Sequence, residues 1–349
     1  MIPDAVPPQP QESSAAVGVK IVIPMAGAGT RLRPHTWSKP KPMVTVAGKP
    51  VLGHVLDTVV RLPAIREVVF IVGYLGDQVE AYVSRAYPQL RACYIEQREL
   101  LGQSHAVWLA REHLQGPALI AFVDTLIETD LATLPGERAE AVAWVKAVPD
   151  PRRFGVAEVN TKKTVRRLVE KPQDMSNNLA LVGVYYFPQA ERLIAAIDAQ
   201  MSRKIHLKGE YFLADAVNIL LEEGLQMRVQ PVEVWQDCGK PESLLEANRY
   251  LLEHGRDNSA LASQRQGIVV VPPVFIDPTA EVQSSVIGPH VSIGPGCVIR
   301  RSLIQNSIVD AGSAIVDTSL SASLIGRDAR VVGRDRSLNV GDSSEIGFA

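Results

Sequence analysis

The chain has 349 residues, of which 46% are hydrophobic and 21% charged, and its formal net charge is −2. This length allows two or more domains, and the near-neutral charge excludes a general basic surface for nucleic acid. The sequence contains no apolar run long enough for a transmembrane helix, and its three widely spaced cysteines indicate a reducing compartment without a disulfide framework.

A short loop near the start carries the strongest signal. The β-branched run at 19–23 predicts a buried strand, and Gly27 and Gly29 follow it in a loop whose N–H groups can turn toward an anion. Arg31 and Lys41 add positive charge, and prolines between them exclude a long helix. The loop therefore predicts a site for a polyanion such as a nucleoside triphosphate.

Two common glycine motifs do not fit this loop. A P-loop would need Gly-Lys-Ser/Thr at the start of a helix, and the dinucleotide fingerprint would need a glycine in place of Leu32. The pattern G-x-G-T-R-L, followed by P-K-P-M, closely resembles the signature loop of the sugar-1-phosphate nucleotidyltransferases.

The segment after the loop alternates between helical and strand patterns. Helices are expected at 50–62, 76–87 and 103–113, and strands at 67–72, 91–95 and 118–123. This alternation predicts an α/β fold with a Rossmann-like, mostly parallel sheet, whose ligands bind beyond the carboxyl ends of the strands. Gly27, Gln97 and Asp124 each follow a predicted strand, so all three could face one crevice.

The middle of the chain is richer in strands, so the sheet is expected to be mixed. Strands are expected at 141–148, 155–159, 165–169, 179–187 and 226–234. Helices are expected after Pro188, from Tyr211 to about residue 223, and from Pro241 to about residue 253. Asp237 is expected in a turn between the last strand and the last helix.

The pattern changes in the last part of the chain. Aliphatic residues at six-residue spacing, followed by Gly-Pro, mark hexapeptide repeats at 276–298, and looser copies continue to residue 329. This resembles a short left-handed parallel β-helix. The predicted domains are a disordered leader at 1–17, a nucleotidyltransferase catalytic domain at 18–255, a linker at 256–266 and the β-helix at 267–349.

The resemblance to the nucleotidyltransferases covers roughly residues 19–252, and the appended β-helix is most similar to long-form glucose-1-phosphate thymidylyltransferases. It implies an Mg²⁺-dependent transfer from a nucleoside triphosphate to a hexose 1-phosphate, giving a nucleoside diphosphate-sugar and pyrophosphate. The favoured substrates are dTTP or UTP and glucose 1-phosphate. A cytoplasmic homo-oligomer assembled through the β-helix is expected, with neither nucleic acid nor membrane as a partner.

The resemblance also assigns catalytic roles. Arg31 would clamp phosphate, Lys41 would bridge the reacting phosphates, and Lys171 would meet the sugar phosphate. Asp124 and Asp237 match the carboxylates that hold Mg²⁺. A turn or helix cap remains an alternative for Asp124, as does an Asx-turn for Asp237.

Other matches concern binding. The nucleotide side would comprise Ala26, Gly27, Gly29, Thr30, Gln97 and Gly102, with Gln97 reading a pyrimidine edge through its amide. The sugar-phosphate side would comprise Gly155, Glu170, Lys171, Val182 and Trp235. The alternatives are a surface glutamine for Gln97, an ion pair for Glu170 and Lys171, and core packing for Val182 and Trp235. Lys39 is expected to be a solvated neighbour.

One position departs from the family pattern. Val123 replaces the glycine that usually precedes the metal-binding aspartate, and its side chain could crowd the ribose or the sugar. This leaves open a non-catalytic nucleotide-sugar sensor or regulatory subunit on the same fold. A mannose-1-phosphate guanylyltransferase is a second alternative, and an acyltransferase activity of the β-helix through His290 is a third.

Overall fold

The computed structural model of the chain describes residues 18–333, so the predicted leader and the last residues of the predicted β-helix range lie outside it. The chain divides into two compact units. Among the described residues, the first comprises 18–30, 36–44 and 51–238, and the second comprises 31–35, 45–50 and 239–333. Over the described range, no helix has the length and apolar character needed to cross a membrane.

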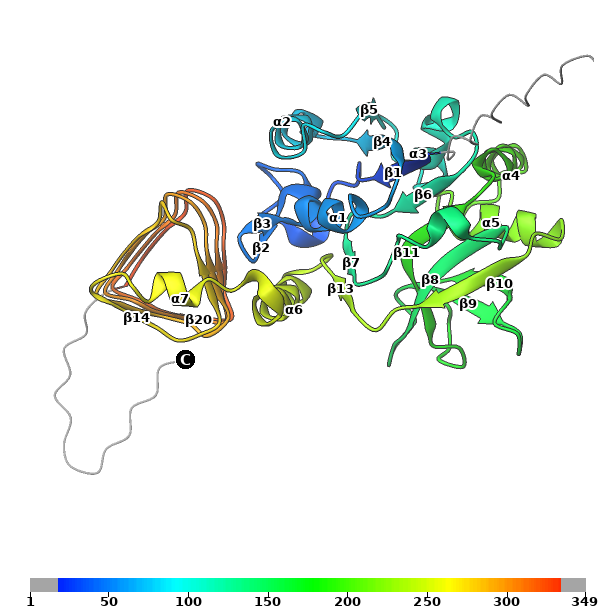
Figure 1. Cartoon of the computed structure of the whole chain (residues 1–349). Helices are drawn as coiled ribbons and strands as arrows, with labels where there is room; N and C mark the ends of the chain where they lie inside the picture. Colours follow the sequence, from blue (N-terminus) through cyan, green and yellow to red (C-terminus); the bar gives the residue numbers. More distant parts are fainter. Residues whose placement is uncertain (1–17, 334–349) are drawn as a thin grey trace, which may run out of the picture. The chain divides into compact units, whose positions relative to one another are not determined.

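The first unit is built on a nine-stranded sheet (Figure 1). Its central strands are parallel: β6 (Ala118–Ala121), β1 (Val19–Pro24), β4 (Ile65–Val72) and β5 (Ala92–Glu96), in this order. All six residues of β1 are buried, as expected for an apolar β-branched strand in the middle of a parallel sheet.

The other half of the sheet is largely antiparallel, which makes the sheet mixed as predicted. The long strand β11 (Leu179–Phe187) runs antiparallel to β6 and pairs with β8 (Ala141–Ala147) and β9 (Gly155–Val159). At the two ends, β10 (Val165–Glu170) pairs with β9 and β12 (Met227–Pro231) pairs with β8.

Five α-helices of the described residues belong to this unit. They are α1 (Val51–Val59), α2 (Gly76–Ala86), α3 (Gln103–Leu109), α4 (Ala190–Ser202) and α5 (Leu213–Glu222). The last three pack on one another and share one core with the sheet, which includes Val107, Leu193 and Val217. The predicted helix at 103–113 is divided, because α3 ends at Leu109 and a 3₁₀ helix (Arg111–His113) follows.

A small antiparallel ribbon joins two distant parts of the first unit. It pairs β7 (Thr125–Ile127) with β13 (Trp235–Asp237). The expectation that Asp237 lies in a turn is therefore wrong: Asp237 is the last residue of β13, directly opposite Thr125. The pattern around Asp237 did not reveal this strand because its partner lies more than a hundred residues earlier.

The second unit contains α6 (Pro241–Leu251), α7 (Ser259–Ala262), the hairpin of β2 (Thr45–Val46) and β3 (Lys49–Pro50), and a β-helix. Pro241 opens α6, as predicted. The buried Asn248 of α6 accepts hydrogen bonds from the backbone N–H of Ala47 and the hydroxyl of Ser292, so it ties the hairpin and the β-helix to α6. Helix α7 lies within the predicted linker range 256–266.

The β-helix consists of three parallel sheets, as expected for the left-handed type, and it has a triangular outline in Figure 1. Its strands are β14 (Ile268–Val270), β15 (Val274–Ile276), β16 (Glu281–Gln283), β17 (Ser285–Ile287), β18 (Val291–Ile293), β19 (Val298–Arg300), β20 (Leu303–Gln305), β21 (Ile308–Val309), β22 (Ala314–Val316), β23 (Ser319–Ser321), β24 (Leu324–Ile325) and β25 (Arg330–Val332). Interior aliphatic residues such as Ile276, Ile293 and Ile315 stack to form its core.

The coils are shorter than three full hexapeptides. Ser302 bonds to Ser285, 17 residues earlier, and Thr318 bonds to Ser302, 16 residues earlier. The corners make this shortening feasible, because Ser284, Arg301 and Asp317 adopt positive φ angles directly after a strand. The six-residue spacing read from the sequence is therefore correct for some sides of the coil and too long for others.

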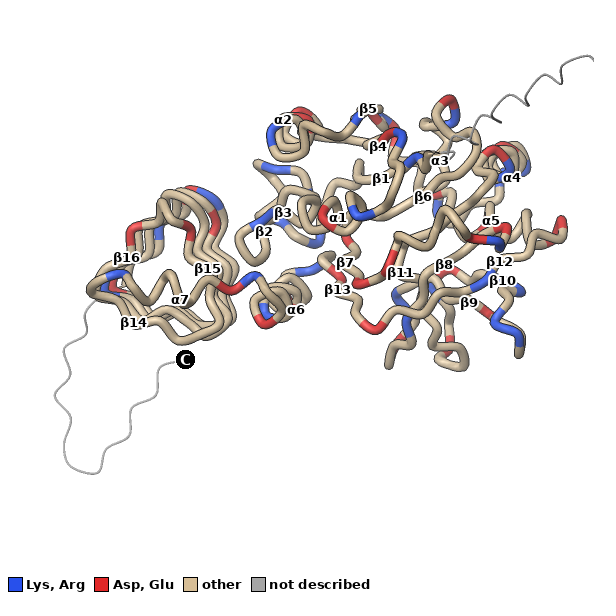
Figure 2. The backbone as a smooth tube through the Cα atoms, in the orientation of Figure 1, with Lys and Arg blue, Asp and Glu red and all other residues tan. Residues whose placement is uncertain are grey.

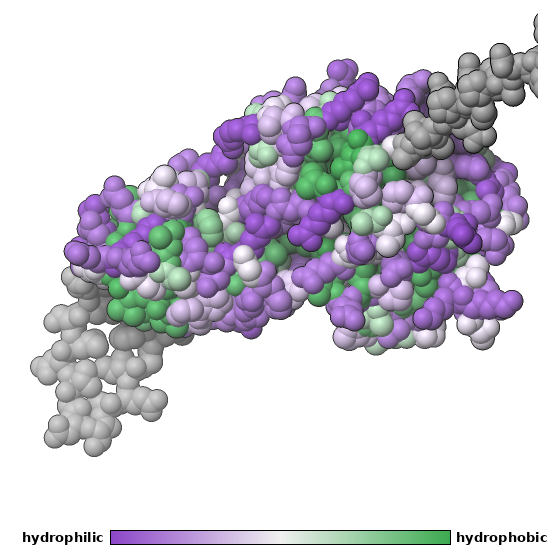
Figure 3. All heavy atoms as spheres, viewed as in Figure 1, coloured by the Kyte–Doolittle hydropathy of each residue, from purple (hydrophilic) through white to green (hydrophobic). Residues whose placement is uncertain are grey.

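Charge and hydrophobicity are distributed differently over the surface. Acidic and basic residues are interspersed along both units (Figure 2). Figure 3 shows hydrophobic residues at the end of the β-helix that faces the viewer. Val269 and Leu303, which are 58% and 42% exposed, both pair with Val286, so the three form an outward-facing row, the aliphatic row.

Candidate active site

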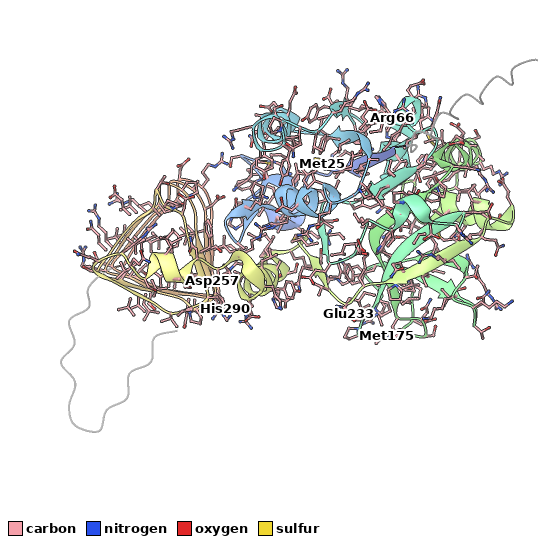
Figure 4. The ribbon with its side chains drawn as sticks, in the orientation of Figure 1. Met25, Arg66, Met175, Glu233, Asp257 and His290 are labelled. Atoms are coloured by element: carbon pink, nitrogen blue, oxygen red, sulfur yellow. The ribbon has the colours of Figure 1, made fainter. Side chains whose placement is uncertain are left out.

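A pocket of about 440 Å³ opens beyond the carboxyl ends of β1, β5 and β6. This is the edge at which parallel α/β sheets bind ligands. Met25, labelled in Figure 4, lines the pocket directly after β1. Seven of the predicted site residues also line it: Ala26, Gly27, Thr30, Lys41, Gln97, Gly102 and Asp124.

The glycine loop is folded tightly on one side and open on the other. Gly29 has a φ of +61°, and a Cβ atom there would lie 3.1 Å from side-chain atoms of both Lys41 and Thr36. The Thr36 hydroxyl also donates to the Gly29 carbonyl at 2.9 Å. By contrast, a Cβ on Gly27 would meet no atom within 4 Å. Gly29 therefore shapes the loop, while Gly27 leaves room beside the pocket.

Lys41 and Asp124 form an ion pair in this pocket. The Lys41 Nζ lies 2.6 Å from the Asp124 Oδ2, and both side chains are partly shielded from solvent. Lys41 begins a short 3₁₀ helix (Lys41–Met43), and Asp124 lies in the turn between β6 and β7. The pair places a cation and a hard oxygen ligand at one end of the pocket.

The ribbon of β7 and β13 brings the second aspartate to the same place. Asp237 pairs with Thr125, and the Cys238 N–H donates to the Asp124 carbonyl at 2.9 Å. Cys238 is buried here, and burial, with the charges of the two aspartates, raises the pKa of its thiol. The two predicted metal ligands are thus neighbours, although they are far apart in the sequence.

This donor set fits a magnesium ion that is completed by substrate. Mg²⁺ is commonly held by one or two carboxylates together with substrate phosphates and water. Asp237 supplies one carboxylate from the end of β13, and Asp124 supplies another from the turn directly before β7, the partner strand of β13. Between residues 18 and 333, no group of three or more histidine, cysteine or acidic residues is arranged to hold a metal by itself.

Gln97 is fixed in the wall of the pocket. It is 6% exposed, so the alternative of a surface glutamine is wrong. Its Nε2 lies 3.2 Å from the Gly102 carbonyl and 3.1 Å from His105 Nδ1. Burial lowers the pKa of His105, which favours a neutral ring that can accept this bond. Both contacts hold the NH₂ group and leave the amide carbonyl free to face another partner.

The predicted sugar-side residues do not line this pocket, but several lie together nearby in the first unit. Gly155 is the direct partner of Glu170, and a Cβ on Gly155 would lie 3.0 Å from Glu170 Oε2. Burial raises the pKa of Glu170, and the charge of Lys171 opposes this rise. The Lys171 Nζ lies 3.8 Å from Glu170 Oε1, so the predicted alternative of an ion pair is present.

The remaining sugar-side candidates are an aromatic and an aliphatic residue. Trp235 packs edge-on against Phe154, with ring centroids 4.8 Å apart, and its buried Nε1 has no hydrogen-bond partner among the described residues. An unpaired buried donor is uncommon in a purely structural position. Val182 is fully buried, which agrees with the core-packing alternative.

Two basic residues of the loop lie in different environments. Lys39 is 2% exposed, so the expectation of a solvated neighbour is wrong. A charged side chain is buried only where it has polar partners, and Lys39 makes such interactions. Arg31 is exposed on a 3₁₀ helix (Thr30–Leu32) and belongs to the second compact unit.

Several residues that line the pocket were not predicted from the sequence. They include Ala28, Leu100, Gln103, Ala106, Phe122 and Glu210. Glu210 reaches the pocket because Tyr211 N–H bonds to the Leu101 carbonyl at 2.8 Å, next to Gly102. Gly102 must be small there, since a Cβ would lie 2.6 Å from Tyr211 N. The sequence feature that could have indicated the position of Glu210 was the Gly209-Glu210-Tyr211 segment before α5.

The histidine of the β-helix is engaged within the second unit. His290 Nε2 lies 2.8 Å from Glu253 Oε1, and His290 Nδ1 lies 3.3 Å from Asn306 Oδ1. Because both ring nitrogens are held by neighbouring side chains, this geometry gives the acyltransferase alternative no support.

Comparisons with known proteins agree with this geometry. The "Nucleotidyl transferase" family model matches residues 20–254. The chain is 32% identical to a glucose-1-phosphate thymidylyltransferase of Streptomyces griseus, over 90% of this chain and 93% of the relative. It is 31% identical to the low-salt glycan biosynthesis nucleotidyltransferase Agl11 of Haloferax volcanii, over 94% and 99%. It is also 31% identical to the UTP–glucose-1-phosphate uridylyltransferase AglF of the same organism, over 67% and 97%.

Solved structures show the same fold. A UDP-glucose pyrophosphorylase complexed with UDP-glucose has a TM-score of 0.61 at 19% identity and covers 68% of this chain and 99% of its own. A putative glucose-1-phosphate thymidylyltransferase from Bacillus anthracis has a TM-score of 0.59 at 22% identity, covering 67% and 95%. The chain belongs to the nucleotidyl transferase family. Within that family it is a sugar-1-phosphate nucleotidyltransferase, as its signature loop predicted.

Proposed function

We propose that the chain transfers a nucleotidyl group from dTTP or UTP to a hexose 1-phosphate, with glucose 1-phosphate the favoured acceptor. The observation that carries this proposal is the ion pair of Lys41 and Asp124 in the pocket beyond the parallel strands, with Asp237 on β13 paired to Thr125, the residue next to Asp124. The names of the thymidylyltransferase and uridylyltransferase relatives support the choice of nucleotide and sugar.

The proposed reaction is an in-line displacement without a covalent enzyme intermediate. An oxygen of the sugar 1-phosphate attacks the α-phosphorus, and the bond from the α-phosphorus to the bridging oxygen of pyrophosphate breaks. The protein contributes alignment and charge neutralisation. We assign charge neutralisation to Arg31 and Lys41, and contact with the sugar phosphate to Lys171. Gly155, Glu170, Val182 and Trp235 complete the proposed sugar side.

Magnesium is the proposed cofactor, with Asp124 and Asp237 as its ligands. When bound, Mg²⁺ would neutralise charge on the triphosphate oxygens. The base would be read by Gln97, whose NH₂ group is already held by Gly102 and His105. The remaining amide oxygen can accept the imide N–H of thymine or uracil, so the geometry is compatible with a pyrimidine nucleotide.

A pyrophosphate-release screen tests the proposal. Each of dTTP, UTP, CTP, ATP and GTP is combined with glucose 1-phosphate, mannose 1-phosphate and related sugar phosphates in the presence of Mg²⁺. We expect the highest kcat/KM with dTTP or UTP and glucose 1-phosphate. The highest activity with GTP and mannose 1-phosphate would instead support a guanylyltransferase.

A non-catalytic sensor is the second candidate, and Val123 is the observation behind it. This residue is 5% exposed and lines the pocket immediately before Asp124. If its side chain excluded productive substrate, the parent protein would bind nucleotide-sugar in calorimetry and release no pyrophosphate with any substrate pair.

We favour catalysis, and Val123→Gly separates the two candidates. The parent should be active, and the variant should change the KM or the substrate preference because the pocket wall becomes smaller. Glycine costs roughly 0.5–1 kcal/mol of stability here, so activities are compared at equal folded fraction. Activity that appears only in Val123→Gly would support the sensor.

We also propose that the protein is a cytoplasmic homo-oligomer assembled through the β-helix. The aliphatic row of Val269, Val286 and Leu303 supports an assembly surface, because exposed apolar rows on a sheet are commonly covered by another subunit. All three cysteines are free thiols, which supports a reducing compartment.

A further inference from the structure

The first unit contains a second pocket, of about 460 Å³, and we call it the arginine pocket. Three arginines line it: Arg166 and Arg167 of β10, and Arg203 after α4. Its size is close to that of the catalytic pocket, and the two share no lining residue. The arginine pocket can therefore hold a ligand of similar size without occupying the catalytic one.

A local irregularity of β10 accounts for two of the arginines. Consecutive residues of a regular strand point to opposite faces of the sheet. The pairing of β10 with β9 shifts register between Val165 and Arg167. Such a bulge re-aims the neighbouring side chains. As a result, Arg166 and Arg167 both line the arginine pocket, although they are adjacent in the sequence.

None of the three guanidinium groups has a direct acidic partner in the described part of the chain. Among residues 18–333, none of these arginines forms an ion pair or a side-chain hydrogen bond. The charge of Arg167 acts on Asp215 without a direct contact. The three arginines outnumber the two carboxylates, Asp215 and Glu222, that line the same pocket, so the charge of the lining is positive. Guanidinium groups match phosphate oxygens in geometry and charge.

Helix α5 supplies another part of the wall. Asp215, Asn218, Ile219 and Glu222 recur at helical spacing and line the pocket on one face. The Asn218 side chain is already used, because it bonds to both the N–H and the carbonyl of Leu168 at 2.8 Å. The two carboxylates remain, and carboxylates accept hydrogen bonds from hydroxyl groups. Ile205 adds an apolar surface.

From this arrangement we propose that the arginine pocket is a second ligand site for a sugar phosphate. Arg166, Arg167 and Arg203 bind the phosphate, and Asp215 and Glu222 bind the hydroxyl groups of the sugar. A bare phosphate ion would be attracted by the arginines and repelled by the carboxylates. A neutral sugar would lack the arginine contacts.

The walls of this pocket lead directly to the candidate active site. Strand β10 ends at Glu170, beside Lys171, and the segment before α5 contains Glu210, which lines the catalytic pocket. Asn218 holds α5 and β10 together. A ligand that bridges α5 and β10 can affect both Lys171, beside the end of β10, and Glu210, in the segment before α5. We infer that a ligand in the arginine pocket alters the apparent KM for the acceptor sugar, and this inference rests on the proposed function.

Calorimetry with glucose 6-phosphate tests binding independently of turnover. This probe lacks the 1-phosphate needed in the proposed reaction. We expect it to bind the parent protein, and to bind the Arg166→Gln/Arg167→Gln double variant at least about tenfold more weakly, since charged hydrogen bonds are lost. Arg85→Gln, which removes an exposed arginine of α2, is the matched control and should bind like the parent.

Further calorimetric titrations show whether glucose 6-phosphate binds in the arginine pocket. Glucose should not bind, inorganic phosphate should bind more weakly than glucose 6-phosphate, and Lys41→Ala should retain binding. Unchanged affinity in the double variant, or loss of binding in Lys41→Ala, would overturn the second site. Equal affinity for inorganic phosphate would overturn the role of the carboxylates.

The activity arm adds glucose 6-phosphate to the pyrophosphate assay. The apparent KM for glucose 1-phosphate should change in the parent and in Arg85→Gln, and stay constant in the double variant. An equal change in all three proteins would refute the coupling. If the parent releases no pyrophosphate with any substrate pair, the proposed function fails, while the calorimetric result still decides the arginine pocket.

Discussion

At the residue scale, the candidate site depends on a few side chains that are held by their neighbours. Lys41 is held close to Gly29 and paired with Asp124, and Gln97 is fixed by Gly102 and His105. Groups fixed in this way can stabilise charge without rearranging during the reaction. Substitutions at these residues should therefore change turnover more than stability.

Lys41→Ala is the direct test of charge stabilisation. We expect kcat to fall by about a hundredfold or more, because a preorganised cation at the reacting phosphates is removed. Steady-state pyrophosphate release measures this, and circular dichroism checks the fold. Lys162→Ala, in an exposed turn, is the control. Parent-like turnover in Lys41→Ala would exclude this residue from the mechanism.

The two aspartates should act as one unit. Asp124→Asn and Asp237→Asn should each lose most of the Mg²⁺-dependent activity. The double variant should lose little more activity than the less active of the two single variants. A magnesium titration of kcat for all three proteins provides the measurement. Asp77→Asn, on the exposed face of α2, should behave like the parent. Losses that multiply independently would argue against a shared ion.

At the element scale, β10 is the last strand at one end of the strand order, and α5 packs against it. The free N–H and carbonyl of an edge strand need partners when they are buried. Asn218 supplies both for Leu168, with bonds of 2.8 Å. One side chain thus replaces part of a missing neighbouring strand.

Asn218→Ala should therefore destabilise the protein by roughly 1–3 kcal/mol, because two backbone groups lose their partner. Urea unfolding should show a lower midpoint with an unchanged slope. Glu223→Ala, at the exposed end of α5, should leave the midpoint within experimental error. An identical midpoint for Asn218→Ala would show that Leu168 finds other partners.

The elements also show how far the sequence could be read. Local periodicity predicted β1, α2 and β11 closely, because a buried strand or an amphipathic helix leaves its own pattern. It did not predict β13, since the three-residue strand exists only through pairing with β7. The burial of Lys39 and the position of Glu210 were missed for the same reason: both depend on long-range neighbours.

At the scale of the whole molecule, the chain combines a sheet that holds two pockets with a β-helix that carries an outward apolar row. The aliphatic row repeats once per coil, because each of its residues pairs with the equivalent residue of the next coil. This row is the surface that we propose for contact with another copy of the chain.

Leu303→Lys tests this assembly role. A charge in the middle of an apolar contact is costly to bury, so the oligomer should become smaller at a given concentration. Multi-angle light scattering of the full chain gives the mass. Gln283→Lys, on another side of the β-helix, is the control. The same mass for parent and Leu303→Lys would place the subunit contact elsewhere.

The two coil lengths of the β-helix have a consequence for how this domain can change during evolution. Coils that differ by one residue still stack with their interior side chains aligned, because the difference is taken up at a corner. A deletion inside a strand would instead turn its interior side chains outward. Gain and loss of single residues should therefore be tolerated at the three edges of the prism and selected against along its faces.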